Sequence, residues 1–448
     1  MSTHKLDESG STIGRFFEKA ARIRSRELQA VLLSFLFVLT LMASYSLLKP
    51  VRDAMSSNWT DAELSSLWTL TFFVSLGAVW LYGAICSRFR TATIVPGIYL
   101  AFAASFLGFY TVLGQQPGYG LVGKAFYVWI SVFSLFHVSV FWTYMADTYS
   151  KEQSLRLFAF IGSGSSIGAI VGPAMALLLV GWLGERNLLL ISAALMIIPV
   201  GIVLRMNQMR AQQRLGNPDS NNAAHTTAMG GNSLAGFQLF FNSRYLLGIG
   251  LFILLYVAIS TFVYFQLKNL MVDVPSDQRV QVWAGMDLAV NVLAVATAWF
   301  GTSRLTAKLG LAKTIALVPA IVAFAMMALA LTPMLWVVVG LQIVRRAGNY
   351  SITRPCREML FTKLDRESRY KAKSVIDIAV YRGGDVMFAW AFTGLTQGLG
   401  LGLGVVALVG SGVAAIWTVV ALYLGRSFER GDIDVPADAA ASPASSPQ

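Results

Sequence analysis

Charged residues are scarce in this chain of 448 residues. Only 13% of the residues are Asp, Glu, Lys or Arg, whereas 56% are hydrophobic, and the mean hydropathy is +0.61. Soluble globular domains carry about 25% charged residues. The shortage of charge therefore excludes a water-soluble domain and indicates a chain that crosses a membrane several times.

Residue types that build metal and catalytic sites are also rare. Cys86 and Cys356 are the two cysteines and have no metal-binding spacing. Of the three histidines, His137 lies in an apolar stretch without a nearby serine–carboxylate pair, so we interpret it as a helix-packing residue. No GxxxxGK[ST] motif occurs, which gives no sign of ATP hydrolysis. We expect no metal, no cofactor and no enzyme activity.

Twelve hydrophobic segments are long enough to cross a membrane as helices. A bilayer core of about 30 Å requires about 20 apolar residues per helix. The first run exceeds the length of a signal-peptide core and no small-residue cleavage site follows it, so we expect no cleavable signal peptide. The segments lie near residues 28–48, 67–86, 92–113, 122–146, 157–182, 187–205, 244–267, 282–302, 312–331, 333–353, 374–397 and 402–424. The sequence predicts an all-α membrane protein with twelve transmembrane helices.

Basic residues orient these segments. Lys and Arg cluster before the first segment and after each even-numbered one, and the other loops are much poorer in them. Because cytoplasmic loops carry the excess of basic residues, we expect both termini in the cytoplasm. This topology explains the net charge of +12 without a nucleic-acid partner. We expect a multi-pass protein of the bacterial inner membrane, embedded in the lipid bilayer as a monomer.

The predicted domain organisation has five parts. Residues 1–27 form a cytoplasmic tail, and residues 28–205 form an N-terminal six-helix bundle. Residues 206–243 are rich in Asn, Gly and Ser and predict a flexible cytoplasmic linker. Residues 244–425 form a C-terminal six-helix bundle, and residues 426–448 a disordered cytoplasmic tail.

The two halves resemble each other at three places, of which the clearest is the end of the first helix. Tyr45-Ser-Leu-Leu-Lys49 and Tyr264-Phe-Gln-Leu-Lys268 lie 219 positions apart (268 − 49). Two like halves joined by a cytoplasmic linker, with the loop GAICSRFRTATI after the second segment, resemble the major facilitator transporters. The resemblance implies two pseudo-symmetric bundles with a substrate site near the bilayer midplane. In the fifth segment, Gly164, Gly168 and Gly172 recur every four positions and predict close helix packing.

Charged residues inside the segments are the candidate functional residues. Each costs about 2.5–3.5 kcal/mol on insertion scales, so it is retained for pairing or for function. In YSLLKPVRDAM, Lys49 and Asp53 are spaced to pair, which leaves Arg52 uncompensated, and Pro50 removes a backbone donor. A second interpretation is that these residues mark the periplasmic end of the helix.

The tenth segment and its extension carry a cationic stripe. On a regular α-helix, Arg346, Tyr350, Arg354 and Arg357 fall within about 80° of one another. Lipid would reject such a stripe, so we expect it to face a hydrated cavity. Arg354 and Glu358 are also spaced to pair one turn apart.

Other interior charges have spacings that allow pairing. Asp287 and Asn291 lie one turn apart, and Asp287 is either a proton or cation site or the structural partner of a basic residue on another helix. The remaining spaced pairs are Lys373 with Asp377 and Arg382 with Asp385.

Counting the interior charges leaves a positive surplus. The candidates are Lys49, Arg52, Lys268, Arg345, Arg346, Arg354 and Arg382 against Asp53, Asp287, Asp377 and Asp385. Guanidinium groups bind carboxylate or phosphate in bidentate fashion. The surplus therefore favours an anionic small-molecule substrate.

The same residues resemble the nucleotide transporter (ATP/ADP translocase) family of plastids and intracellular bacteria. YSLLKPVRD is similar to that family's first-span pattern, and FWTYMAD followed by Glu152 to its fourth-span end. Lysines of the family pattern are replaced by Arg52, Arg357 and Asn349. The most specific block is matched by Gly348-Asn349-Tyr350-Ser351, Pro355-Cys356-Arg357-Glu358-Met359, Lys371, Lys373, Asp377 and Gly383-Gly384.

The charges and the resemblance together predict a secondary active transporter that carries a nucleotide or similar phosphorylated organic anion by alternating access, with ATP/ADP-type exchange as one form. The predicted substrate-binding residues are Lys49, Arg52, Tyr264, Lys268, Arg346, Tyr350, Arg354 and Arg382. The predicted coupling or gating residues are Asp53, Glu152, Asp287, Asn291, Lys373, Asp377 and Asp385. Two alternatives stay open: a proton-coupled transporter of another organic anion or drug, and a membrane sensor or assembly partner that does not transport.

Overall fold

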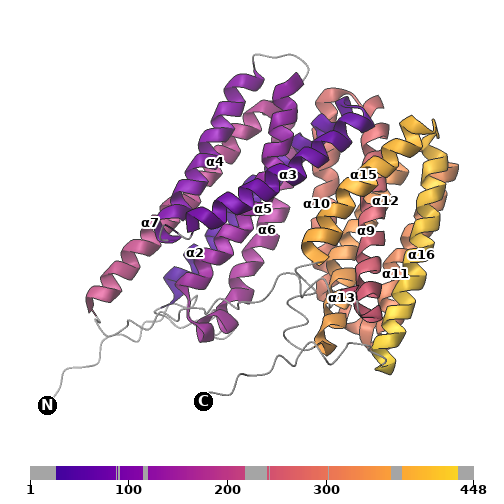
Figure 1. The fold of residues 1–448 in the computed structure, drawn as a ribbon. Coiled ribbons are helices and arrows are strands. Elements are labelled where there is room, and N and C mark those ends of the chain that lie inside the picture. Colours follow the sequence, from indigo (N-terminus) through magenta and orange to yellow (C-terminus); the bar gives the residue numbers. More distant parts are fainter. Residues whose placement is uncertain are drawn as a thin grey trace, which may run out of the picture. The chain divides into compact units, whose positions relative to one another are not determined.

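The computed structural model describes residues 27–86, 88, 91–114, 120–216, 240–241, 243–300, 302–364 and 376–431 (Figure 1). All regular secondary structure in these residues is helical. Ten helices in this part of the chain are long and apolar enough to cross a membrane. They overlap the first nine predicted segments and the twelfth. The all-α membrane class is confirmed, while the count of twelve spans and their division into two six-helix bundles stay predictions.

The described helices group into two compact units. Unit 1 comprises the described residues of Met1–Met55, Phe73–Ala224 and Ser276–Leu288, and unit 2 those of Ser56–Phe72, His225–Pro275 and Ala289–Gln448. Each unit thus includes a short segment from the other half of the sequence. These segments are the first part of α3 (Asp61–Cys86) and the first part of α10 (Ser276–Phe300).

Unit 1 is built around α2 (Leu28–Met55), which packs against three neighbouring helices. Its buried rings include Phe37, which meets Phe141 edge to face at 4.9 Å. The helix continues through Pro50, so the proline does not end it. The other helices of the unit are α4 (Thr91–Leu113), α5 (Gly120–Thr148), α6 (Lys151–Leu183) and α7 (Leu188–Gly216). Helix α7 extends beyond residue 205, where the sequence predicted the linker to begin.

Glycines let α6 approach α2 closely. A Cβ atom at Gly164 would lie 2.7 Å from the carbonyl oxygen of Phe35, and one at Gly172 would lie 2.6 Å from that of Ala43. Gly168, between them, would clash with the carbonyl oxygen of Leu39. The four-residue spacing of these glycines thus places one bare helix face against the α2 backbone, as the sequence predicted.

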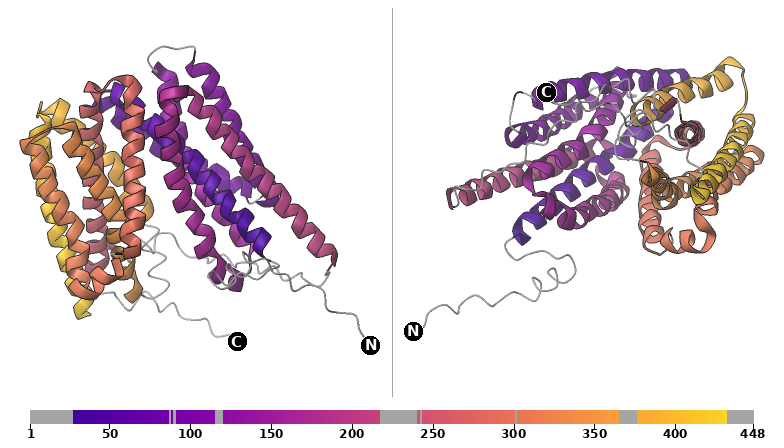
Figure 2. Two further views of the ribbon diagram at one scale, coloured as in Figure 1. Left: turned by 180° about the vertical axis from the view of Figure 1, so that it is seen from behind. Right: turned by 60° about the horizontal axis from the view of Figure 1, so that its bottom comes forward.

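Unit 2 is built around α9 (Arg244–Leu270), which packs against α12 (Leu335–Gly348), α15 (Gly383–Thr393) and α16 (Leu403–Arg430). Helix α11 (Thr302–Leu331) completes the unit by packing against α12 and α16. Two views in Figure 2 show these helices side by side within the unit. The buried Trp417 of α16 contacts Phe252 and Tyr256 of α9, so aromatic rings fill the space between these two helices.

The tenth and eleventh predicted segments are interrupted helices. Helix α12 runs directly into a π-helical turn, η4 (Asn349–Thr353), and then into α13 (Arg354–Leu360) and η5 (Phe361–Lys363). The eleventh segment consists of η6 (Ile376–Arg382, also π-helical), α15 and η7 (Gly394–Gly398). π-helical turns occur frequently at functional sites. The remaining short elements are the 3-10 turns η1 (Ser56–Asn58), η2 (Glu185–Asn187) and η3 (Met271–Asp273).

Candidate functional site

Unit 1 contains a cluster of two basic and two acidic side chains, Lys49, Arg52, Asp53 and Asp287, which we call the balanced cluster. The Lys49 Nζ atom lies 2.5 Å from an oxygen of Asp287 and 3.5 Å from an oxygen of Asp53. Arg52 donates to the other oxygen of Asp53 through Nε at 2.9 Å and Nη2 at 2.6 Å. Both carboxylates are buried.

The balanced cluster corrects one prediction and bears on another. Lys49 and Asp53 form an ion pair as predicted, but Arg52 is not uncompensated, because its guanidinium forks onto the carboxylate of the next residue. Arg52 also lies over the ring of Tyr127 at 5.2 Å. For Asp287, the structure supports the interpretation as the partner of a basic residue on another helix, Lys49.

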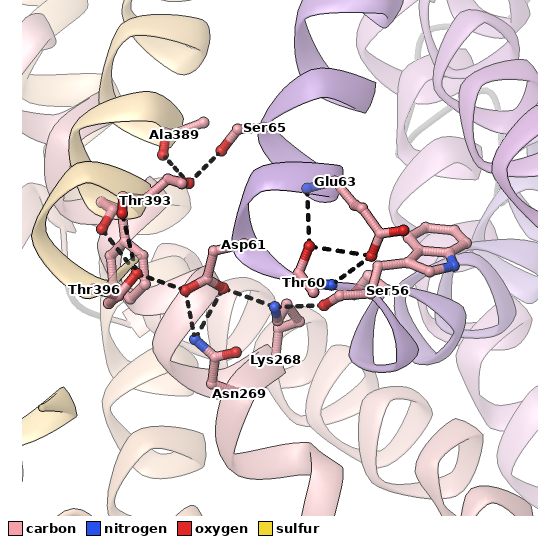
Figure 3. Close-up of polar contacts among 12 residues, drawn as sticks. Ser56, Thr60, Asp61, Glu63, Ser65, Lys268, Asn269, Ala389, Thr393 and Thr396 are labelled. Carbon is pink, nitrogen blue, oxygen red and sulfur yellow. Dashed lines mark hydrogen bonds and ion pairs between the residues drawn. The ribbon is translucent and has the colours of Figure 1, made fainter. Parts of the chain in front are cut away.

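Unit 2 contains a second lysine–aspartate pair, between Lys268 and Asp61 (Figure 3). The Lys268 Nζ atom donates to Asp61 at 2.7 Å and to the carbonyl oxygen of Trp59 at 2.8 Å. Asn269 and Thr396 donate to the same carboxylate, at 3.0 Å and 2.8 Å. One buried carboxylate thus joins the start of α3, the end of α9 and η7.

Asp61 was missed by sequence reasoning because it precedes the predicted segment 67–86. A local signal was present. Asp61 begins α3 within Thr60-Asp61-Ala62-Glu63, where the Thr60 backbone nitrogen donates to Glu63 at 2.8 Å and the Glu63 backbone nitrogen donates to the Thr60 hydroxyl at 3.2 Å. This reciprocal arrangement marks a helix N-terminus and places Asp61 in the first turn.

The most unusual charge of unit 2 is Arg345, on α12. Its side chain is buried, with only 2% of the residue exposed. Its Nε and Nη2 atoms both donate to Oε1 of Gln342, at 3.1 Å and 2.6 Å, and its guanidinium carbon lies 5.8 Å from the centre of the Tyr256 ring. Among the described residues, the Nη1 atom finds no hydrogen-bond partner and no carboxylate forms an ion pair with this guanidinium.

Tyr256 connects Arg345 to a second arginine. Its ring meets that of Tyr381, on η6, at 6.3 Å in an edge-to-face arrangement. The guanidinium carbon of Arg357, on α13, lies 5.7 Å from the centre of the Tyr381 ring, and Arg357 Nη1 donates to the Tyr381 hydroxyl. Arg357 also pairs with Glu358 at 2.9 Å, whereas no carboxylate in the described part of the chain pairs with Arg345. We call Arg345, Tyr256, Tyr381 and Arg357 the arginine–tyrosine cluster.

The predicted cationic stripe is wrong as a regular α-helical face, because η4 interrupts it. The wider π-helical turn at Asn349–Thr353 shifts the residues that follow it, so 100° per residue no longer holds between Arg346 and Arg354. Arg346 is half-buried, whereas Tyr350 is 44% exposed and Arg354 is exposed. The predicted binding roles of these residues stay predictions.

The other predicted residues are distributed over both units. Tyr264 is half-buried, its ring lies 5.6 Å from that of Trp68 in a tilted arrangement, and its hydroxyl donates to the Ser56 hydroxyl at 3.3 Å. Glu152 is exposed at the start of α6 and accepts from Ser150 at 2.9 Å. The half-buried residues are Asn291, Arg382 and Asp385, and the structure gives no ion pair between the last two. Lys373 lies outside the described residues, as does the side chain of Asp377.

His137 behaves as a packing residue. Its Nδ1 atom lies 3.1 Å from the carbonyl oxygen of Phe133, one turn earlier in α5, and its ring lies 4.5 Å from that of Tyr45. Within the described part of the chain, no group of three metal-binding side chains gathers anywhere.

Comparison with known proteins gives a family and a set of structural neighbours. The sequence model of the Major Facilitator Superfamily matches residues 30–364, which is 335 of 448 residues. No curated protein sequence matches the chain significantly.

Three solved structures illustrate the structural likeness. The nucleoside transporter NupG is 17% identical with a TM-score of 0.60, and the match covers 90% of this chain and 99% of that one. A bacterial homologue of the human lysosomal transporter Spinster is 12% identical with a TM-score of 0.58, over 93% and 100% of the two chains. A POT family transporter in complex with a thioalcohol-conjugated peptide is 12% identical with a TM-score of 0.59, over 89% and 96%. At identities of 12–17%, these TM-scores show a shared fold and nothing more specific.

Proposed function

Since the chain belongs to the Major Facilitator Superfamily, we propose that its substrate is an organic anion, with a nucleotide or similar phosphorylated compound as the leading class. The protein is a membrane transporter of the major facilitator type and not an enzyme. The proposal adds the identity of the cargo and alternating access as the mechanism.

One observation carries the proposal: Arg345 is a buried guanidinium without a described acidic partner. It lies ten residues into α12, about 15 Å along the helix. In the predicted tenth span, residues 333–353, that depth corresponds to about half the thickness of a bilayer core. Arginine stays protonated in proteins, so the charge cannot be lost by deprotonation. A permanent positive charge at mid-membrane is costly unless a negative group meets it.

The lysines that are paired with acids have a different role in this proposal from that of Arg345. Lys49 and Lys268 each pair with an aspartate of another helix, Asp287 near the middle of α10 and Asp61 at the start of α3. We propose that these pairs act in coupling or gating, by breaking and reforming as the helices move. Substrate would then meet Arg345, for which the described residues supply no acidic partner.

A ligand panel tests the substrate class directly. Purified protein is heated with ATP, ADP, AMP, sugar phosphates, dicarboxylates and neutral nucleosides, and the unfolding temperature is recorded. Binding to the native state alone stabilises it by RT ln(1 + [L]/Kd), about 2.7 kcal/mol at 100-fold saturation. Phosphorylated compounds should raise Tm and nucleosides should not. A response to nucleosides alone would contradict the anionic substrate.

Transport assays in proteoliposomes then separate exchange from proton coupling. The labelled form of the best ligand is presented outside, with or without the unlabelled ligand inside. Uptake that requires internal ligand supports exchange, whereas uptake driven by an imposed proton gradient into empty vesicles supports the proton-coupled alternative. Protein that binds the ligand in the panel but gives neither kind of uptake would favour the sensor alternative.

A further inference from the structure

Buried nitrogen donors without acceptors gather around Tyr256 and Tyr381. Besides Arg345 Nη1, the indole Nε1 of Trp417 and the Nε of Arg357 lack hydrogen-bond partners within the described part of the chain. The Trp417 ring lies 5.8 Å from that of Tyr256, and Trp417 has 0% exposure. Each donor therefore belongs to a side chain that touches one of the two tyrosine rings.

The three donors come from three separate elements of unit 2, namely α12, α13 and α16. The large majority of buried side-chain polar atoms in native proteins are hydrogen-bonded, so each donor without a partner needs an explanation. An indole N–H and a guanidinium N–H can only donate. What is missing here is thus an acceptor, and two of the three donors carry positive charge.

From this arrangement we infer that the orphan donors of Arg345, Trp417 and Arg357, arranged around Tyr256 and Tyr381, form the oxyanion-binding site of unit 2. The inference rests on the proposed function and adds the residues and the ligand group. The ligand group is a phosphate or carboxylate, whose several oxygens can accept from more than one donor at once. Trp417 and Arg345 are absent from the predicted binding residues, so the site differs from the cationic stripe.

Gln342 explains how the site stays ready for a ligand. Its neutral amide oxygen accepts from two nitrogens of Arg345 and holds the guanidinium without neutralising it. A carboxylate at the same position would satisfy the charge internally. The geometry thus uses a neutral acceptor for orientation and leaves the positive charge for the ligand.

The sharpest test exchanges this neutral acceptor for an acid of nearly the same shape. Gln342→Glu should raise the unfolding temperature of the ligand-free protein, because it gives Arg345 an internal partner. It should also weaken binding of the best anion from the panel by about 30-fold or more, the range for losing a buried charge-assisted contact. Unchanged affinity in a folded Gln342→Glu protein would overturn the site.

Two further variants probe the donors separately. Trp417→Phe removes the indole N–H but keeps a ring, and Arg345→Gln removes the charge. Their matched controls are Trp336→Phe, an exposed tryptophan on α12, and Arg426→Gln, an exposed arginine on α16. We expect about tenfold weaker binding for Trp417→Phe, a larger loss for Arg345→Gln and no change for the controls. If Arg345→Gln does not fold, Arg345→Lys keeps the charge without the fork and should still bind more weakly than wild type.

The probes also separate failure of the site from failure of the proposed function. Inorganic phosphate, AMP and succinate are titrated into wild type and variants, with binding measured by calorimetry. If wild type binds AMP and the variants bind it with the same affinity, the site is overturned and the proposed function stands. Binding of succinate but not of phosphate compounds, lost in Gln342→Glu, would support the oxyanion site and overturn the phosphorylated substrate. A wild type that binds none of them would overturn both.

Discussion

The balanced cluster of unit 1 and the arginine–tyrosine cluster of unit 2 handle buried positive charge in opposite ways. In unit 1, Lys49 and Arg52 face Asp53 and Asp287, so two cations meet two anions. In unit 2, Arg345 meets a glutamine and a tyrosine ring. Burial alone therefore does not identify a charge that binds a ligand. The informative feature is burial without an internal counter-ion.

Unit 2 also contains a buried lysine that is paired with an acid, so buried cations without an acidic partner are not a general feature of this unit. Lys268 is 1% exposed and has Asp61, just as Lys49 has Asp287. The two lysines occupy equivalent positions in the repeated Tyr-x-x-x-Lys stretch. Arg345 therefore stands out within its own unit as well as against unit 1.

Removing the acid of the most buried pair should have the largest effect on stability. Asp61→Asn leaves Lys268 with a carbonyl oxygen and a neutral amide in place of a carboxylate. Breaking a buried pair by removing one partner costs about 3–5 kcal/mol. We expect a clear drop in Tm, or loss of folded protein in detergent. A fluorescence-detected thermal melt checks this, and a Tm equal to wild type would show that the pair does not hold the fold.

The sequence could predict most of the fold because the signals were local. Lengths of apolar runs gave the ten long helices, and the spacing of Gly164, Gly168 and Gly172 gave the close contact of α6 with α2. The pairing of Lys49 with Asp53 was predictable for the same reason, since i and i+4 residues share a helix face.

The candidate site was less predictable because its parts are distant in the chain or depend on irregular helix geometry. Tyr256, Arg345 and Trp417 lie far apart in sequence, and no spacing rule connects them. Arg346 was preferred over Arg345 from a count of 100° per residue, which fails once η4 inserts a π-helical turn. Asp61 was missed because the search for interior charges stopped at the predicted edge of its helix.

Removing the Asp287 carboxylate in unit 1 should lower stability less than removing that of Asp61 in unit 2, because Lys49 has a second acidic neighbour. Asp287→Asn leaves Lys49 with Asp53 at 3.5 Å, so the lysine is not stranded. We expect a loss of about 1–2 kcal/mol, smaller than for Asp61→Asn. Chemical denaturation of both variants in the same detergent gives the ranking. The reverse order would indicate that Asp53 is fully occupied by Arg52.

Neutral pairs give a smaller effect that should be the same in both units. Ser44 and Ser192 share a hydrogen bond at 2.6 Å in unit 1, and Ser65 and Thr393 share one at 2.8 Å in unit 2. Hydrogen bonds between membrane helices contribute about 0.6 kcal/mol on average. Ser44→Ala and Ser65→Ala should each lower stability by roughly that amount. If one of these variants lost much more stability than the other, the two units would differ in how they tolerate any lost contact. The different effects of the charge variants could then not be assigned to charge pairing.

Removal of Arg345 should change stability least of all, although it should abolish anion binding. In Arg345→Met the side-chain stem is replaced by one of similar length, and the desolvated charge disappears. Exchanging buried charges for apolar side chains is often neutral or stabilising. Against this, Gln342 Oε1 loses both of its donors, which costs about 1–3 kcal/mol, so the two contributions nearly cancel. Thermal melts without ligand should give a Tm close to that of wild type, far above that of Asp61→Asn. A collapse as large as that of Asp61→Asn would mean that Arg345 has a structural acidic partner, and the contrast between the two units would be lost.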